Sequence, residues 1–380
     1  MVVDLKESRV KIDKIDKEIA RLFEERMEVA TDVAAYKRST GKKVLDPARE
    51  EEKIAALRAL TDNEFNKMGI EDLFRQIMSI SRKYQYKELG AETDTPLPFR
   101  QVDELDVDSD TRVVCFGEPG AFTEQAMEEV FGKDITAVNK ISFKEVIEAV
   151  ANGEAKYGVL PIENTTTGGI TDIYDLLPEY DIAIVAEHVV KVEQALLGKK
   201  GAKIEDIKTV YSHPQGLMQC AKFLEEHSYM TTKSYHSTSS GARKVAEEDD
   251  MTQAAIASTR AAKAFGLEVL KESINYESEN YTRFIVISNQ KVFLSNANKI
   301  SLSFEVKHQA GSLYNMLSNF YYNDLNLTKI ESRPIENKTW EYRFFVDIEG
   351  NLNDPAVSNA LASISEYASE LHVLGNIMTK

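Results

Sequence analysis

The chain has 380 residues, which is enough for two or three domains that each bury a core of their own. Its apolar fraction of 43% and charged fraction of 28% are typical of globular proteins in solution. There is no run of about 18 apolar residues, so we expect a cytoplasmic protein with no membrane span or secretory signal.

Charge and cysteine content narrow the range of ligands. The net charge of −16 argues against a nucleic-acid partner, because phosphate contacts need clustered cations. Residues 1–90 carry 19 Lys and Arg against 18 Asp and Glu, so an anionic ligand is most easily held there. Cys115 and Cys220 lie in apolar stretches without metal-site spacing. We expect both to be reduced core residues, and we expect no metal, disulfide or cofactor.

Three helices are predicted at the start of the chain. Apolar residues recur at three- and four-residue steps over residues 5–40, which predicts one long helix ending at Gly41. A second helix is predicted over 47–60, with Asp46 as its N-cap, and a third over 64–87. Residues 1–90 are therefore predicted to be all-helical. The first helix is longer than a small domain needs, which indicates a partner chain packed along it.

Cations interrupt the apolar stripe of the first predicted helix. Arg26 falls on the stripe, where a guanidinium needs an anion to offset its burial. Lys37 lies 11 residues further on, about 20° around the helix and so on the same face. Arg9 is roughly 25 Å from Arg26 along the helix, so it would join the same pocket only from an antiparallel copy of the chain. The alternative is that these cations extend into solvent or pair with neighbouring carboxylates.

The next two helices add polar candidates. Asp46, Arg49 and Glu50 cluster at the start of the second helix, while Ser81 and Gln85 lie four residues apart on one face of the third. The alternative is a helix cap, two surface charges and an incidental polar pair.

From residue 91 the pattern changes twice. Residues 91–110 contain seven acids, one Arg and two prolines without periodicity, which predicts a solvated linker. From residue 112 short apolar runs alternate with helical stretches, which indicates an α/β domain with largely parallel strands. Several strands end in polar turns, where open α/β sheets bind ligands. The predicted strands are 112–116, 157–160, 182–185, 209–211, 254–257 and 284–287.

A hydroxyl and a guanidinium stand side by side at Thr282 and Arg283, just before the last of these strands. We expect both where a loop enters the sheet. A neutral proton donor beside a fixed cation suits an anionic substrate that must lose a hydroxyl. The alternative is a strand edge with an exposed Arg.

The last segment has its own order of elements. Predicted strand 299–306, helix 311–322, strands 327–332 and 340–348, helix 354–369 and strand 371–377 follow one another. This βαββαβ order predicts a ferredoxin-like α+β sandwich.

Each segment resembles a known family. Residues 1–90 resemble the all-helical class of chorismate mutase through all three helices. Residues 111–290 resemble prephenate dehydratase, a two-lobed α/β fold like a periplasmic binding protein, through Phe122-Thr123, Glu163-Asn164-Thr165, Ser212-His213-Pro214-Gln215 and Thr282-Arg283-Phe284. Residues 298–380 resemble an ACT domain through Gly311-Ser312-Leu313 and Glu331-Ser332-Arg333-Pro334. In this order, the segments resemble the bifunctional chorismate mutase/prephenate dehydratases.

The resemblance implies three sets of site residues. The mutase set is Arg9, Arg26, Lys37, Asp46, Arg49, Glu50, Ser81 and Gln85. The dehydratase set has Thr282 and Arg283 as catalytic residues and Thr123, Glu163, Asn164, Thr165, Ser212, Gln215, Asn280 and Phe284 as substrate-binding residues. The effector set is Gly311, Ser312, Leu313, Glu331, Ser332, Arg333 and Pro334. Thr165 and Ser312 depart from the usual Ser and Ala of the family, and Thr165 keeps the hydroxyl.

The resemblance also implies two reactions. Chorismate rearranges to prephenate without proton transfer or metal, so the protein has to hold a reactive conformer and stabilise developing charge. The implied contacts are Arg9, Arg26 and Arg49 to the carboxylates, Lys37 and Gln85 to the ether oxygen, and Asp46 and Glu50 to the ring hydroxyl. Prephenate then loses water and carbon dioxide to give phenylpyruvate.

For the second reaction, Thr282 is implied as the hydrogen-bond donor to the leaving hydroxyl, and Arg283 or another cation as the partner of a carboxylate. His213 is the alternative acid. The ACT-like segment is expected to bind phenylalanine as an allosteric inhibitor between subunits of a homodimer or larger homo-oligomer. The alternative is a module that only dimerises.

Two rival functions fit the pattern less well. An NAD-dependent prephenate dehydrogenase needs a Gly-x-Gly-x-x-Gly turn after a strand, and residues 117–122 read Gly-Glu-Pro-Gly-Ala-Phe. A non-catalytic amino-acid sensor would not need the Thr-Arg-Phe motif or the eight mutase positions.

Overall fold

The computed structural model describes residues 4–42, 44–89, 98–277, 279–309, 311–335, 338 and 340–379. The chain divides into two compact units, one of residues 1–97 and 304–371 and the other of residues 98–303 and 372–380. None of the described helices combines the length and apolar character needed to cross a membrane.

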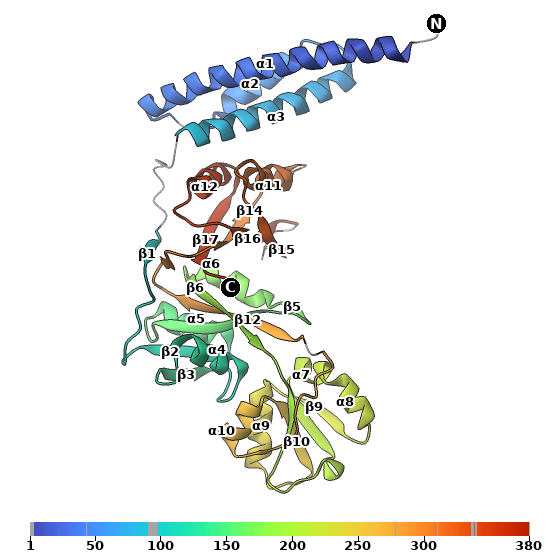
Figure 1. The fold of residues 1–380 in the computed structure, drawn as a ribbon, viewed down its shortest axis with the longest axis vertical. Coiled ribbons are helices and arrows are strands. Elements are labelled where there is room, and N and C mark those ends of the chain that lie inside the picture. The colour runs from blue at the N-terminus through green and yellow to red at the C-terminus, as the bar shows by residue number, and fades with distance from the viewer. Residues whose placement is uncertain are drawn as a thin grey trace. The chain divides into compact units, whose positions relative to one another are not determined.

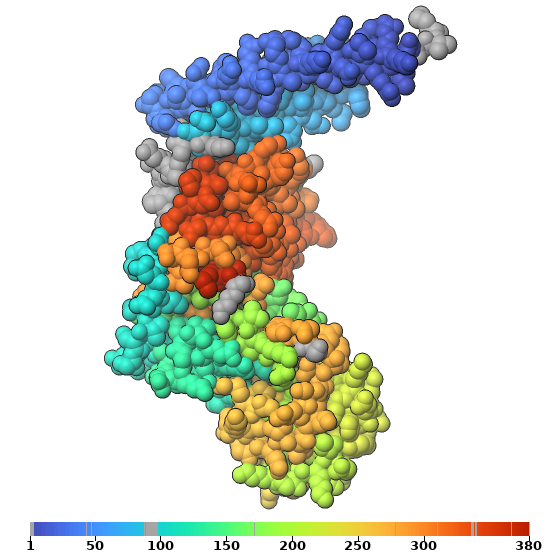
Figure 2. All heavy atoms as spheres, viewed as in Figure 1, coloured from blue at the N-terminus to red at the C-terminus, as the bar shows by residue number. Residues whose placement is uncertain are grey.

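The first unit begins with the three helices that the periodicity predicts, α1 (Leu5–Thr40), α2 (Pro47–Arg58) and α3 (Glu64–Leu89). Asp4 caps the start of α1, and Gly41 ends it in the left-handed conformation with φ of 65°. Large apolar side chains of α1 remain uncovered, among them Ile12 and Ile15 with exposed fractions of 54% and 58%. Figure 2 shows the surface of α1 in dark blue along its whole length.

The C-terminal segment has the predicted βαββαβ order. Its elements are β14 (Lys299–Glu305), α11 (Ser312–Tyr322), β15 (Leu327–Pro334), β16 (Tyr342–Glu349), α12 (Pro355–Tyr367) and β17 (Glu370–Ile377). Strands β14 and β17 each begin in one unit and end in the other. Strand β15 pairs antiparallel with β16 and stands at the end of the strand order.

The second unit contains a two-lobed α/β domain, as predicted (Figure 1). The first lobe is built on the strand order β6-β12-β4-β2-β3 with helices α4, α5 and α6. Their bounds are β2 Arg112–Phe116, α4 Phe122–Phe131, β3 Thr136–Lys140, α5 Phe143–Ala151, β4 Tyr157–Asn164, α6 Thr171–Glu179, β6 Ala183–Lys191 and β12 Tyr281–Ser288. A short strand β5 (Gly168–Gly169) pairs with the end of β4.

The second lobe is a five-stranded sheet in the order β11-β7-β10-β8-β9. Its elements are β7 Ala195–Gly198, β8 Thr209–Ser212, α7 Pro214–Gln219, α8 Ala221–Glu226, β9 Thr231–Ser234, α9 Thr238–Glu247, β10 Gln253–Ala257, α10 Thr259–Phe265 and β11 Glu268–Lys271. The chain crosses between the lobes twice, from β6 to β7 and from β11 back to β12. Each lobe has its own cluster of buried apolar side chains.

Two expectations need correction. Pairing is mixed, because β12 runs antiparallel to both β4 and β6, and β7 runs antiparallel to β10 and β11. The expected linker 91–110 lies outside the described residues up to 97, and within the rest Arg100–Val102 forms β1. This strand pairs in parallel with β13 (Val292–Leu294), so backbone hydrogen bonds hold part of the acidic segment.

Candidate active sites

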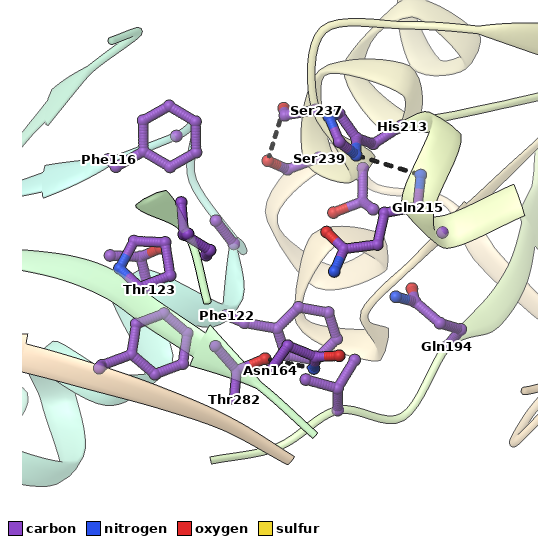
Figure 3. Close-up of a pocket in the computed structure, with 18 of the residues that line it drawn as sticks. Phe116, Phe122, Thr123, Asn164, Gln194, His213, Gln215, Ser237, Ser239 and Thr282 are labelled. Atoms are coloured by element: carbon purple, nitrogen blue, oxygen red, sulfur yellow. Dashed lines mark hydrogen bonds between the residues drawn. The ribbon is translucent and has the colours of Figure 1, made fainter. Parts of the chain in front are cut away.

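A pocket of about 310 Å³ opens between the two lobes of the second unit (Figure 3). Phe116, Phe122 and Phe284 give it an apolar wall, and hydroxyl and amide side chains from both lobes face it. Among the described residues that line it, none is Lys, Arg, Asp or Glu. An anionic ligand in this pocket would therefore be met by neutral donors.

Thr282 and Asn164 lie together at the base of this pocket, on the paired strands β12 and β4. The Asn164 side-chain oxygen accepts a hydrogen bond from the backbone N–H of Thr166 at 3.0 Å, which fixes the orientation of the amide. The Asn164 amide nitrogen then donates to Thr282 Oγ1 at 2.9 Å and to Asn280 Oδ1 at 2.8 Å. Because Thr282 accepts this bond, its own hydroxyl proton remains available to donate into the pocket.

Helix N-termini supply further donors to the pocket. Thr123 lies in the first turn of α4, and Ser237 caps α9, where Thr238 and Ser239 also line the pocket. In Figure 3, Ser237 and Ser239 lie across the pocket from Thr123. The first N–H groups of a helix carry partial positive charge and attract anions. Two ten-residue helices therefore start at a pocket that lacks charged side chains.

His213 is the N-cap of α7 and lines the same pocket. Its Nδ1 accepts a hydrogen bond from the backbone N–H of Gln215 at 3.3 Å. Burial lowers the pKa of the His213 imidazole below its ordinary value, because desolvation disfavours the charged ring. A neutral ring that already accepts a backbone bond is suited to holding the turn and is a poor proton donor to substrate.

Ion pairs join the lobes beside the pocket. Arg243 on α9 contacts Glu118 in the turn after β2, with Nε and Oε2 2.7 Å apart. Arg260 on α10 contacts Glu128 on α4, with 2.6 Å between Nη2 and Oε1. The backbone is also in close contact here, since Ser258 Oγ donates to the carbonyl of Gly120 at 2.6 Å.

The predicted dehydratase residues divide into two groups. Thr123, Asn164, Gln215, Thr282 and Phe284 line the pocket. Asn280 is buried behind it and contacts Asn164, whereas Thr165 bonds the backbone of Tyr281 and Ser212 Oγ donates to the carbonyl of Ile256 at 2.7 Å.

The structure does not bring Arg283 and Glu163 to the lining of this pocket. Arg283 lies inside β12, so strand alternation directs its side chain to the face opposite Thr282. There its Nη1 lies 3.3 Å from an oxygen of Glu163, and its Nε lies 3.4 Å from an oxygen of Glu187. Direct contact of Arg283 with a substrate carboxylate does not fit this geometry.

A second cavity, of about 220 Å³, lies among the N-terminal helices. Seven of the eight predicted mutase residues line it together: Arg26, Lys37, Asp46, Arg49, Glu50, Ser81 and Gln85. Lys53 and Arg82 also line it, although neither was predicted from the sequence. Arg9 does not line this cavity, in line with its position 17 residues before Arg26 on the same helix.

Hydrogen bonds within the N-terminal unit already position two of the polar side chains that line this cavity. Lys37 Nζ donates to the carbonyl of Val44 at 2.6 Å, and Asp46 caps α2 by accepting from the N–H of Arg49 at 3.1 Å. Arg26 Nη1 is buried without a hydrogen-bond partner among the described residues. Burial lowers the pKa of Arg26, opposed by the nearby charge of Glu50. A buried guanidinium nitrogen that lacks a partner marks a place for an anionic ligand.

Comparison with known proteins places both cavities within domains of known families. The profile of "Chorismate mutase type II" matches residues 8–86, and that of "Prephenate dehydratase" matches residues 113–292. A bifunctional chorismate mutase/prephenate dehydratase of Aquifex aeolicus is 32% identical over 377 residues, covering 98% of this chain and 97% of that protein. The chain belongs to this family of bifunctional enzymes. It has chorismate mutase and prephenate dehydratase activities for phenylalanine biosynthesis.

Other relatives of the bifunctional family agree. The protein of the same description from Neisseria gonorrhoeae is 33% identical over 97% of this chain and 95% of its own length. Among solved structures, a prephenate dehydratase from Arthrobacter aurescens in complex with L-Phe superposes with a TM-score of 0.66 at 29% identity, covering 71% of this chain and 90% of that one. A structure described as a quorum quenching acylase, GqqA, has a TM-score of 0.65 at 29% identity, covering 71% and 98%. The fold therefore does not by itself define the chemistry.

Two glutamines that line the pocket between the lobes were not predicted as site residues. Gln194 has an exposed fraction of 3% and donates to Gln219 Oε1 at 3.1 Å, while Gln219 in turn approaches Thr166 Oγ1 at 3.4 Å. Gln194 precedes β7 and Gln219 ends α7, so only the tertiary fold brings them together. The one sequence signal for Gln219 is its position four residues after Gln215, about one helical turn away.

The predicted effector residues lie at two places in the C-terminal segment. Gly311 is the N-cap of α11 with φ of 81°, followed by Ser312 and Leu313 in the first turn. Glu331 to Pro334 form the end of β15, paired with β16.

Proposed function

We propose that each cavity performs one reaction with the residues that line it. Chorismate binds among α1, α2 and α3, and prephenate binds between the lobes of the second unit. The observation that carries the dehydratase assignment is the contact between Asn164 and Thr282, which turns a threonine hydroxyl towards an uncharged pocket.

In the mutase cavity, positive side chains bind the dicarboxylate and stabilise the negative charge that develops as the ether bond breaks. Arg26 and Arg49 take the carboxylates, and Lys37 with Gln85 donates to the ether oxygen, where negative charge grows in the transition state. Asp46 and Glu50 accept from the ring hydroxyl. Ser81 Oγ accepts a hydrogen bond from Gln85 Nε2 at 3.4 Å, so its own hydroxyl proton can be donated to substrate. Support comes from the seven shared lining residues and from the unpartnered Nη1 of Arg26.

We assign Arg9 to the cavity of a second copy, which makes the enzyme a homodimer or larger homo-oligomer. Two observations support this. Arg9 is on α1 yet outside the cavity of its own chain. Four large apolar residues of α1, Ile12, Ile15, Ile19 and Leu22, are at least half exposed. A run of exposed apolar side chains along one helix is the surface that a second helix covers.

In the dehydratase pocket, Thr282 donates a hydrogen bond to the hydroxyl of prephenate. As the C–O bond breaks, the proton passes from Thr282 Oγ1 to the departing hydroxyl, which leaves as water, while the electron pair of the C–CO₂ bond moves into the ring and carbon dioxide is released. The ring becomes aromatic, which drives the reaction. Thr282 regains its proton from solvent, so the balance is one proton consumed per prephenate dianion.

We propose that backbone N–H groups at the starts of α4 and α9 bind the carboxylates of prephenate, in place of Arg283. Thr123 and Ser239 add hydroxyl donors at those ends. An anion at a helix N-terminus needs no ionised side chain, which suits a pocket without Lys or Arg.

The test of this assignment is substitution at Thr282. Thr282→Ala should lower the kcat of prephenate turnover by about 10²–10⁴-fold, the usual contribution of a positioned proton donor. Thr282→Ser keeps the hydroxyl and should retain most of the activity. Chorismate consumption by the same variants is the internal control and should not change. A Thr282→Ala enzyme that makes phenylpyruvate at the wild-type rate would remove Thr282 from this role.

We further propose that the C-terminal segment binds phenylalanine at Gly311–Leu313 and Glu331–Pro334 and inhibits the dehydratase, in a cytoplasmic enzyme. The L-Phe complex of the Arthrobacter relative and the βαββαβ order support this. The backbone N–H groups at the start of α11 suit the carboxylate of an amino acid. Phenylalanine titration of prephenate turnover tests the proposal, and a flat response would leave the segment as a dimerisation module.

A further inference from the structure

Behind the dehydratase pocket, two charged residues flank the two residues that define its base. Glu163 precedes Asn164 on β4, and Arg283 follows Thr282 on β12. The two strands pair Thr282 with Asn164 and Arg283 with Glu163 in the same register. The Arg283–Glu163 ion pair, at 3.3 Å, thus lies directly behind the Thr282–Asn164 hydrogen bond, on the opposite face of the sheet.

A third and a fourth charge extend this arrangement. Glu187 on β6 contacts Arg283 Nε at 3.4 Å through one oxygen and Lys299 Nζ through the other. The side chains of Glu187 and Lys299 are each only 8% exposed. Desolvating two charges is costly, and apolar residues of similar size often serve stability as well or better. A buried pair at this place therefore calls for a role besides stability.

Irregularities in the pairing of β12 indicate what this role is. The pairing of β12 with β4 shifts between Arg283 and Phe284, one residue beyond Thr282. The pairing of β12 with β6 shifts between Val286 and Ile287. At a bulge the regular ladder is interrupted, so backbone hydrogen bonds constrain the strand less there. Side-chain contacts on the rear face, with Arg283 at their centre, are placed to hold this stretch of β12.

We propose that the Lys299–Glu187 pair positions the dehydratase site: it anchors Arg283, and through Arg283 the backbone that carries Thr282. Lys299 is the first residue of β14, the strand that opens the C-terminal βαββαβ segment. The same pair therefore also couples Thr282 to that segment. This second consequence rests on the proposed inhibition by phenylalanine, whereas the positioning role does not.

The experiment compares Glu187→Gln, Lys299→Met and the double variant in the full-length enzyme. Each single variant should lower the kcat for prephenate about tenfold or more, since small misplacements of reacting groups are costly, with KM within about twofold. The double variant should be no slower than the slower single variant, because both substitutions break one link. Lys299→Arg, which keeps the charge, should restore most of the rate. Inhibition by phenylalanine should weaken in both single variants while isothermal titration still detects phenylalanine binding.

Lys191→Met is the matched control. Lys191 is also a strand residue in an ion pair, with Glu193 at 3.0 Å, but this pair is exposed. Its removal should leave kcat, KM and the response to phenylalanine unchanged. Circular dichroism identifies any variant that fails to fold, in which case Glu187→Gln, the variant closest in shape to wild type, decides the question.

Two results separate the possible failures. A folded Glu187→Gln enzyme with wild-type kcat would overturn the positioning proposal, whatever its response to phenylalanine. A wild-type enzyme that phenylalanine does not inhibit would overturn the coupling and the proposed regulation together. The kcat of the variants would still decide the positioning role in that case.

Discussion

The environment of His213 shows how one residue departs from its apparent role. A histidine in a substrate pocket is a natural choice for a proton donor. Here its Nδ1 already accepts a backbone hydrogen bond and burial lowers its pKa, so the neutral ring is the form that fits. Protonation would remove the acceptor and leave a buried charge.

The stability of the enzyme should therefore depend on pH through His213. The lowered pKa means that the unfolded chain takes up a proton at a higher pH than the folded chain does. Stability from the neutral ring is present above the ordinary histidine value of about 6.5 and is lost as the pH falls through the folded-state pKa. His213→Asn keeps a cap acceptor but cannot titrate, so the thermal unfolding midpoint of the variant should fall less than that of wild type between pH 7.5 and pH 5. Equal losses in the two proteins would contradict this reading.

Site residues on helices were easier to predict from the sequence than site residues on strands. The mutase residues from Arg26 to Gln85 follow from helical periodicity and from the resemblance, and seven of them share a cavity. The sequence indicated a loop at Thr282 and Arg283, where neighbouring side chains can face the same way. Arg283 was therefore expected beside Thr282 at the substrate. In the strand that forms instead, adjacent side chains point to opposite faces. Gln194 and Gln219 had no local signal, since they meet only across the folded second lobe.

Most elements were predictable, whereas the pairing of strands was not. The three N-terminal helices and the βαββαβ order of the C-terminal segment match the periodicities closely. Strand direction depends on where the chain returns after crossing to the second lobe, and β12 returns antiparallel to β4 and β6. The strands β3, β7, β9, β11 and β13 are three to five residues long and were not predicted.

The turn between β2 and α4 packs tightly against α10 of the other lobe. Gly120 has φ of 80°, and a Cβ placed there would lie 2.5 Å from the Cα of Ala261. Backbone atoms cannot yield as a flexible side chain can, so only glycine permits this approach of the lobes. The nearby ion pairs of Arg243 with Glu118 and of Arg260 with Glu128 also join the two lobes.

Gly120→Ala should separate the lobes and weaken dehydratase catalysis. We expect kcat/KM for prephenate to fall roughly tenfold or more, because pocket residues from the two lobes would no longer meet in the reactive geometry. Gly153→Ala is the matched control, since Gly153 has a similar φ of 75° but open space around its missing side chain. Both variants carry the same kind of backbone strain. If they lose dehydratase activity equally, strain alone explains the loss and the close approach of the lobes has no catalytic part.

At the scale of the whole molecule, the sites use two physical strategies for anionic substrates. In our proposal, cations surround the dicarboxylate in the cavity of the N-terminal helices, and helix N-termini with neutral side chains surround it in the pocket between the lobes. The two sites belong to different compact units of the chain. We expect prephenate, the product of one reaction and the substrate of the other, to be released and to pass between enzyme molecules through solution.

Mixing two single-site variants tests this account most directly. Lys37→Ala should lack mutase turnover but still convert prephenate, and Thr282→Ala should convert chorismate only as far as prephenate. Neither variant alone should form phenylpyruvate from chorismate at an appreciable rate, whereas an equimolar mixture should form it after a lag in which free prephenate accumulates. If either substitution removes both activities from a folded enzyme, the assignment of the two reactions to two separate cavities is contradicted. If each variant keeps its remaining activity and the mixture still forms no phenylpyruvate, the passage of prephenate through solution is contradicted instead.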